Sequence, residues 1–347
     1  MYCMGIDHHA QYSQITVLDE DGREVKAGRV FNTRSDVNKF LEGLEDVEAV
    51  IESGRSSYTM VDLMEELGVR VKIANPSQVK AIAKARIKTD KRDSRILAHL
   101  LRVGLIPEVY RRGKENRESQ QVLRQRVFYV RMLARVKNRI WTLLAQQGEE
   151  VRERRAEVKE LSTRKGKEFL KGLRLGEHDQ KLLSCLLASY DHLEEKIKES
   201  DSLVKGLYGQ MKEAQRVRTV PGFGEFFSLL VVTEIADISR FEDAGKLHAY
   251  AGVIPSTHSS GERSYHGQII KAGNRWLRWA AVEAVTPACR ADFDIRLFYE
   301  RFARRKGANV AKVATARRLL TIIYKILKEE RAYMPYKRQT KKESAAL

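Results

Sequence analysis

The chain has 347 residues and carries 64 Lys and Arg against 46 Asp and Glu, a formal net charge of +18. With 43% apolar residues, six Pro and 22 Gly it can bury a core, which excludes disordered, collagen-like and small disulfide-rich proteins. Its three cysteines lack zinc-site spacing, the N-terminus lacks a secretory pattern, and no apolar stretch is long enough to cross a bilayer. We therefore expect a cytoplasmic protein with reduced thiols, no membrane contact and two or three domains.

The positive charge is concentrated in two segments. Residues 1–60 hold 6 basic and 11 acidic side chains, whereas residues 111–140 hold 10 basic and 2 acidic ones, and residues 261–347 hold 20 and 8. Two basic segments on a chain that begins acidic indicate surfaces that contact a phosphate backbone. Solvated helix faces are the plainer alternative.

Residues 1–76 alternate between strand and helix patterns. Period-two alternation and apolar runs predict strands, and capped stretches of helical spacing predict helices. The predicted order is three antiparallel strands, helix, strand, helix and strand, with strands at 1–7, 13–19, 23–31, 47–53 and 69–76 and helices at 35–44 and 57–68. This order, followed by a further helix, resembles the RNase H-like fold of RuvC resolvases, retroviral integrases and many transposases. In that fold the first and fourth strands lie side by side and parallel.

Four acidic residues are placed to meet at one edge of this sheet. Asp7 and Glu52 end the first and fourth strands, and Asp90 and Asp93 share a face of the helix that begins near Asp90. Together these carboxylates offer enough oxygen ligands for two Mg²⁺ ions of the kind used in phosphoryl transfer. The alternative is that Asp90 caps its helix and Asp93 is a first-turn acid favoured by the helix dipole. The adjacent His8 and His9 are interpreted as polar residues at a strand exit rather than as metal ligands.

Two long amphipathic helices are predicted at about 116–147 and 179–211. We expect them to pair as an antiparallel coiled-coil arm, with residues 148–178 forming the turn and possible short helix between them. Such an arm suits dimerisation, nucleic-acid binding or both, and simple packing is the alternative. The candidate nucleic-acid contacts on the first helix are Arg124, Arg131, Arg135 and Arg139.

A turn with Pro221, Gly222 and Gly224 separates two helices in the last third of the chain. It resembles a helix-hairpin-helix element, in which glycines let backbone amides approach a DNA phosphate. A plain turn between helices has the same appearance. Gly222 and Gly224 are therefore candidate nucleic-acid contacts.

A polar segment from 255 to 267 is predicted to be a loop that carries Ser259 and Ser260 before Gly261. A serine in a glycine-flanked loop beside arginines can act as a nucleophile toward a phosphodiester. An ordinary polar loop is the alternative. The accompanying cations, all candidate nucleic-acid contacts, are Arg263, Lys271, Arg275 and Arg278.

Several short motifs occur together along the whole chain. They are GID at 5–7, IESG at 51–54, KTDKRDSRILA at 88–98, TVPGFG at 219–224, Phe241 followed after six residues by HAYAGVIP at 248–255, SSG at 259–261 and KAGNRWLR at 271–278. In this order and over about residues 3–330, the sequence resembles the insertion-sequence-110 family of transposases, the DEDD recombinases that a bridge RNA guides. Ser53 and Ser94 depart from the residues common at their positions, and neither change removes a functional group.

The resemblance implies a domain plan and a mechanism. It implies a RuvC-like catalytic domain at 1–112, a coiled-coil arm at 113–215, a mostly α-helical transposase domain at 216–335 and a basic tail at 336–347. Asp7, Glu52, Asp90 and Asp93 match the family's acidic quartet, and Ser260 matches its nucleophile, with Ser259 as the competing candidate. It further implies Mg²⁺, a covalent phosphoserine link to DNA, donor and target DNA as substrates, a bridge RNA, and a dimer or tetramer.

Three functions remain to be distinguished at this point. The first is an RNA-guided DNA transposase that excises and inserts a mobile element. The second is a metal-dependent junction nuclease that uses the acidic quartet alone. The third is a non-catalytic architectural protein that binds nucleic acid.

Overall fold

The computed structural model describes the chain except for residues 84–88, 150, 152, 154–157, 159, 162, 261–262, 270–271 and 336–347, and it describes only the backbone at 257–260, 263–266 and 268. The described chain divides into two compact units, Met1–Arg112 and Gly113–Leu347. Each unit is considered by itself.

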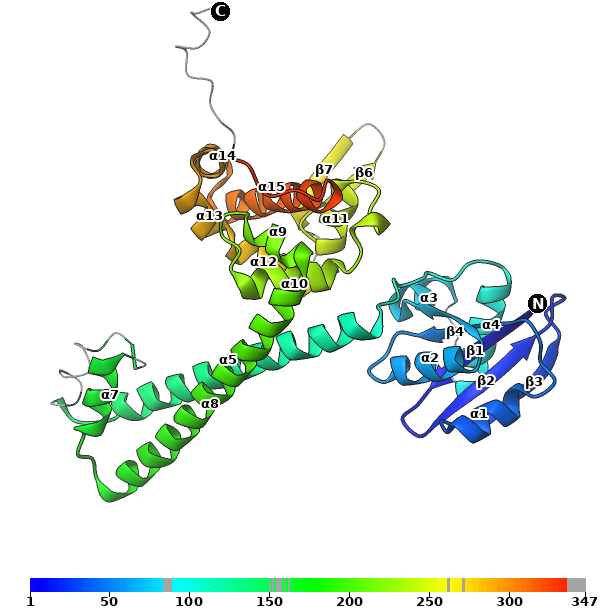
Figure 1. Ribbon diagram of the computed structural model, residues 1–347, viewed down its shortest axis with the longest axis horizontal. Helices are drawn as coiled ribbons and strands as arrows, with labels where there is room; N and C mark the ends of the chain where they lie inside the picture. Colours follow the sequence, from blue (N-terminus) through cyan, green and yellow to red (C-terminus); the bar gives the residue numbers. More distant parts are fainter. Residues whose placement is uncertain are drawn as a thin grey trace, which may run out of the picture. The chain divides into compact units, whose positions relative to one another are not determined.

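The first unit is a five-stranded mixed sheet with helices on both faces (Figure 1). Its strands are β1 (Tyr2–His8), β2 (Tyr12–Leu18), β3 (Glu24–Phe31), β4 (Val47–Glu52) and β5 (Arg70–Ala74), in the spatial order β3-β2-β1-β4-β5. Its helices are α1 (Arg34–Leu41), α2 (Ser57–Glu66), α3 (Pro76–Ile82) and α4 (Asp90–Arg102). β1 pairs with β4 in parallel and with β2 antiparallel, so the predicted strand order and the adjacency of the first and fourth strands are confirmed.

Strand pleating divides the apolar side chains of this sheet between two cores. Met4 and Ile6 of β1 and Ile51 of β4 pack with the residues of α1 and α2. Cys3 of β1 and Val50 of β4 point the other way and pack with α3 and α4. Because successive residues of a strand face opposite sides, this division also fixes the direction of the polar residues that follow.

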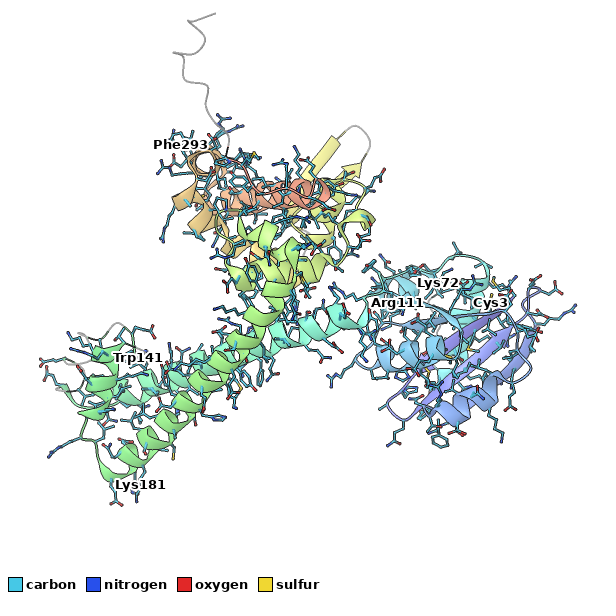
Figure 2. The ribbon with its side chains drawn as sticks, viewed as in Figure 1. Cys3, Lys72, Arg111, Trp141, Lys181 and Phe293 are labelled. Atoms are coloured by element: carbon cyan, nitrogen blue, oxygen red, sulfur yellow. The ribbon has the colours of Figure 1, made fainter. Side chains whose placement is uncertain are left out.

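The second unit begins with two long helices that pack along each other. They are α5 (Lys114–Ala145) and α8 (Glu177–Gln210), close to the predicted spans, and the short helix α7 (Arg164–Lys171) lies in the segment between them. A core around Ile140, Leu144, Phe169 and Leu183 joins the three helices. Trp141, which Figure 2 labels, lies on α5 beside this core.

The rest of the second unit is mostly helical, as predicted, and has its own core. Its elements are α9 (Lys212–Arg218), α10 (Glu225–Ile235), η1 (Ile238–Arg240), α11 (Ala244–Ala251), β6 (Pro255–Ser260), β7 (Arg263–Ile269), α12 (Arg275–Glu283), α13 (Val285–Ala291), α14 (Phe293–Lys306) and α15 (Ala308–Lys328). The fully buried Leu229, Leu277 and Leu319 place α10, α12 and α15 around one core. Among the described residues, none of the helices has the length and apolar character needed to cross a membrane.

The prediction of a loop between Pro255 and Gly267 was wrong. This segment contains two antiparallel strands, β6 and β7, in which Ser259 pairs with Ser264 and Ser260 with Arg263. Serine, threonine and glycine are ordinary loop residues, and this composition concealed the strands. Pairing with a second short strand supplies the backbone hydrogen bonds that the composition did not predict.

Candidate active site

The acidic edge of the first sheet depends on an unusually close contact between helix α4 and strand β1. A Cβ atom added to Gly5 would lie 1.9 Å from the carbonyl oxygen of Ser94 and 2.5 Å from the backbone nitrogen of Ala98. No side chain fits in that space, so glycine lets the helix lie directly on the strand. The buried hydroxyls of Ser94 and Thr16, 2.8 Å apart, hold the same contact from β2. The first turn of α4 is thereby held over the sheet near the end of β1.

Asp7 and Glu52 extend from neighbouring parallel strands toward the helix α4. The register pairs Ile6 with Ile51, so Asp7 and Glu52 each follow a paired residue. Asp7 is two residues after Gly5, and Glu52 is two after Val50, which packs with α3 and α4. Strand alternation therefore directs both carboxylates to the face on which α4 lies.

Helix α4 begins with its two acids in the first turn. Thr89 is the N-cap residue, because its side chain accepts a hydrogen bond from the backbone N–H of Arg92. Asp90 is therefore not the cap, contrary to the alternative considered for it. Asp90 and Asp93 are both first-turn acids, where the helix dipole also favours negative charge.

Asp7 and Asp90 meet at His9. Nε2 of His9 lies 3.4 Å from Oδ2 of Asp7 and 3.1 Å from Oδ2 of Asp90, and ligand atoms of these three residues lie within 4.8 Å of one another. The interpretation of His9 as a simple strand-exit residue therefore needs correction. Its position directly after β1 was a signal that could have placed it beside Asp7. Glu52 and Asp93 are not part of this three-residue group.

Residues of β2 and β3, and Asn32 directly after β3, hold His9 in place. The Tyr12 ring lies 4.7 Å from the His9 ring, and its hydroxyl donates to Oδ2 of Asp90 at 3.3 Å. Asn32 donates its side-chain N–H to the His9 carbonyl at 2.8 Å and accepts from the Ser13 hydroxyl. The Arg29 guanidinium lies 3.5 Å from the centre of the Tyr12 ring. Sequence reasoning missed Tyr12 and Asn32, because their positions become meaningful only after the strands are paired.

This group has the donor atoms of a divalent-cation site. Nε2 of His9 is shielded from solvent and, among the described residues, makes no hydrogen bond of good geometry despite its two close carboxylate oxygens. A metal ion accepts a lone pair from such an atom, and two carboxylates supply the negative charge that a hard cation requires. The residues therefore fit a divalent metal.

The predicted nucleophiles lie at the end of the hairpin in the second unit. Ser259 and Ser260 are the last two residues of β6, and Arg263 begins β7. Gly261, which directly follows Ser260, lies outside the described residues, as does Lys271. The hairpin thus carries both serines at consecutive positions of one strand.

A buried polar network anchors the helix that follows the hairpin. Asn274 caps α12 by accepting from the backbone N–H groups of Trp276 and Leu277. Its side-chain nitrogen donates to Glu234 at 2.7 Å and lies 3.1 Å from the Tyr250 hydroxyl. Glu234 is 1% exposed and also pairs with Arg124 at 3.1 Å. Sequence reasoning assigned no role to Glu234, Tyr250 or Asn274 in this network.

Three of the predicted nucleic-acid contacts gather around one indole ring. The guanidinium groups of Arg124, Arg131 and Arg275 each lie 5.6 Å from the centre of the Trp276 ring. Arginine beside an aromatic ring is a common combination in single-strand binding surfaces. Arg135 and Arg139 are exposed farther along α5.

Other predicted contacts have structural roles in the second unit. Arg278 donates to the carbonyl oxygen of Ala251 at 3.1 Å, so it joins α12 to the end of α11. Gly222 has φ +92°, and an added Cβ would lie 2.3 Å from the carbonyl oxygen of Ala284. Its glycine is thus explained by backbone conformation and close packing. Gly224 precedes α10 as its N-cap residue and has open space around it.

Family models match both units. A model described as "Transposase IS116/IS110/IS902 family" matches residues 214–300, and a model described as "Transposase", for the DEDD transposases of IS110, matches residues 4–148. The first matched segment contains the hairpin and its polar anchor, and the second contains the acidic edge.

Similar proteins extend over nearly the whole chain. The transposase for insertion sequence element IS1111A of Coxiella burnetii is 24% identical over 335 residues, which cover 95% of this chain and 90% of the relative. A probable family 20 transposase of Pseudomonas aeruginosa is 24% identical over 350 residues, which cover 96% of this chain and 98% of the relative. The pilin gene-inverting protein of Moraxella bovis is 27% identical over 286 residues, or 76% of this chain and 74% of the relative.

Proposed function

This chain belongs to the IS116/IS110/IS902 family of transposases and is a DNA-recombining enzyme; on that premise we propose that it excises and inserts a mobile DNA element through a covalent bond between Ser260 and DNA. The observation that carries the phosphoryl-transfer part of this proposal is the meeting of Asp7 and Asp90 at His9, on an edge that the close packing of α4 against β1 creates. The part played by Ser260 rests on its match to the family's nucleophile in the SSG motif. Such a carboxylate-rich edge suits chemistry on a phosphodiester.

We assign the acidic quartet to the metal site. Asp7 and Asp90 supply carboxylate oxygens, and His9 adds a nitrogen donor. Glu52 ends the strand next to that of Asp7, and Asp93 lies in the same helix turn as Asp90. When bound there, Mg²⁺ or a similar divalent ion would neutralise charge on the phosphate oxygens and help the leaving oxygen depart. The residues of β2 and β3 keep the carboxylates and the imidazole oriented.

The proposed covalent step exchanges one phosphoester bond for another. The Ser260 hydroxyl loses its proton, its oxygen forms a bond to phosphorus, and the bond from phosphorus to one deoxyribose oxygen breaks. That sugar oxygen leaves and takes up a proton to become a hydroxyl. A hydroxyl of a second strand then reverses the step, which releases Ser260 and joins the new strands without a net loss of phosphoester bonds.

We further propose that a bridge RNA selects the DNA and that subunits of a dimer or tetramer combine their acidic and serine sites. The basic segments offer affinity for phosphate without sequence information, and base pairing to RNA can supply the sequence. Purifying the protein from its host under nuclease-free conditions and sequencing the bound nucleic acid tests this part. A defined structured RNA is the expected result, and random fragments would contradict RNA guidance.

A trapping experiment separates this function from that of a junction nuclease. On nicked suicide substrates, the wild-type protein and Ser259→Ala should form a protein–DNA adduct that resists denaturation, whereas Ser260→Ala should not. Ser259→Ala is the matched control, because it removes a neighbouring hydroxyl from the same strand. Metal-dependent cleavage that persists at the wild-type rate in Ser260→Ala would favour the nuclease.

A further inference from the structure

A cavity of about 480 Å³ lies between helices α11, α14 and α15 of the second unit. Figure 1 shows α11 and α14 beside α15, and both helices pack against it. The side chains that line the cavity are His248, Phe298, Ala314, Arg317, Arg318, Thr321, Ile322 and Lys325. None of them belongs to the site proposed above.

The cavity is strongly cationic. Arg317, Arg318 and Lys325 line it from α15, and none of the lining residues that the structure describes is acidic. Within the described part of the chain, no ion pair is made by any of these three cations. Three positive side chains around one concave surface without carboxylate partners favour an anion of more than one negative charge or a chain of anions.

The remaining lining residues give the cavity one hydrogen-bonded polar pair and one aromatic surface. Nε2 of His248 and the Thr321 hydroxyl lie 3.0 Å apart in a hydrogen bond. Burial and, next, the positive charge of Arg317 lower the pKa of His248, so at neutral pH it serves as a hydrogen-bonding group rather than a fourth cation. Phe298 forms an aromatic wall, and the guanidinium of Arg318 lies 4.8 Å from its ring centre.

A second cavity of about 310 Å³ continues the first along α15. It shares Arg318, Ile322 and Lys325 and adds Arg331 and Tyr333. Among the described residues that line it, Asp294 is the one acid. The two neighbouring cavities, which share Arg318, Ile322 and Lys325, are together called the α15 trough.

The chain's own C-terminal tail is a poor occupant of this trough. Residues 336–347 carry four Lys and Arg and one Glu, so their charge has the same sign as the trough. Like charges repel, so the charge of the tail disfavours it as the occupant.

We propose that the α15 trough binds a single nucleic-acid strand, with backbone phosphates on Arg317, Arg318 and Lys325 and one nucleoside against the wall formed by Phe298 and Ile322. Stacking on an aromatic ring or a guanidinium plane is the usual way in which an unpaired base is held. This inference rests on the proposed function only in taking the chain to act on nucleic acid. RNA and DNA strands share these phosphates and stacking bases, and the RNA and single-stranded DNA arms of the test below distinguish the two sources.

The test measures binding without catalysis, in EDTA, by fluorescence anisotropy of labelled 12-nucleotide RNA, single-stranded DNA, duplex DNA and an abasic DNA oligomer. The double variant Arg317→Gln/Lys325→Gln should weaken binding of single strands about tenfold at fixed salt. For this variant, the plot of the logarithm of the binding constant against the logarithm of the salt concentration should be less steep. The slope should change by about 0.7 for each phosphate contact that is lost. Arg301→Gln/Arg305→Gln is the matched control, since it removes two exposed cations of α14 that line neither cavity.

A second variant tests the nucleoside. Phe298→Leu should weaken binding of RNA or single-stranded DNA about tenfold, a typical loss for one stacked base, and leave the abasic oligomer unaffected. Binding of every oligomer equal to that of the control pair would overturn the proposal. For Phe298→Leu, losses for duplex and abasic DNA equal to that for the single strands would also overturn it, because Phe298 would then hold no unpaired base. Adduct formation through Ser260 is measured in a separate assay. Its failure therefore cannot be mistaken for a loss of strand binding in the trough variants.

Discussion

In the first unit, regular secondary structure fixes the acidic side chains, whereas in the second unit the serines lie at the end of a two-stranded hairpin. Asp7 and Glu52 are directed by the pleat of paired strands, and α4 lies on the backbone at Gly5. The hairpin is followed instead by a helix anchored through Asn274 to the buried Glu234. The comparison teaches that close backbone packing positions the acidic edge, whereas a small number of polar contacts anchor the helix that follows the hairpin.

The largest effect is expected from the carboxylates of the first unit. Asp7→Asn keeps the size of the side chain but removes one carboxylate charge of the proposed metal site. We expect recombination to fall about a thousandfold, because such an ion contributes several kcal/mol to phosphoryl transfer. Asp21→Asn, in an exposed turn of the same unit, is the control. Equal activity of the two variants in a plasmid recombination assay would argue against the metal site.

Gly5→Ala tests whether close packing makes the first site. The new Cβ would overlap the Ser94 carbonyl, so α4 must move and carry Asp90 away from Asp7. We expect the free energy of unfolding to drop by about 1–3 kcal/mol, the usual range for overpacking. Gly28→Ala is the control, because its nearest contact is 3.7 Å. Chemical denaturation measures both, and equal stability would show that α4 tolerates the shift.

Glu234→Gln is the corresponding test in the second unit. It weakens a buried charged network with Arg124 and Asn274, and we expect a loss of about 1–3 kcal/mol in stability. Adduct formation should fall more than stability alone explains, since the anchored helix follows the hairpin. Glu283→Gln, an exposed acid of α12, provides the comparison. If Glu234→Gln has the same unfolding temperature and adduct yield as Glu283→Gln, then Glu234 does not support the serine hairpin.

His9→Gln should have the smallest effect. It removes a nitrogen near Asp7 and Asp90 but leaves their charges in place. We expect apparent Mn²⁺ affinity to weaken about tenfold, the lower end of the range for residues that support a metal site. Calorimetric titration with Mn²⁺ measures this difference. His99→Gln, which changes a histidine of α4 away from the group, is the control. Unchanged affinity would mean that His9 only fills space between the carboxylates.

The sequence predicted the strand order of the first unit because its alternation and turn residues are local signals. The adjacency of Asp7 and Glu52 followed from that order. His9 and Tyr12 escaped prediction because their roles depend on which residues lie across the turn between β1 and β2. Their types alone are compatible with many ordinary positions.

In the second unit the long helices followed from apolar periodicity, but the hairpin did not follow from its composition. Serine and glycine favour loops, and only pairing between β6 and β7 makes this segment extended. The role of Glu234 was also hidden, because it lies in the apolar run of α10 and its partners are distant in sequence. Buried polar networks of this kind depend on tertiary contacts.

The most direct test of the central claim is mass spectrometry of the peptide that remains joined to DNA after trapping on a suicide substrate. The account predicts a nucleotide on Ser260, formed with a divalent cation and lost in Asp7→Asn. A nucleotide on another residue, or full-rate attachment to Ser260 in Asp7→Asn, would contradict a reaction that uses both sites.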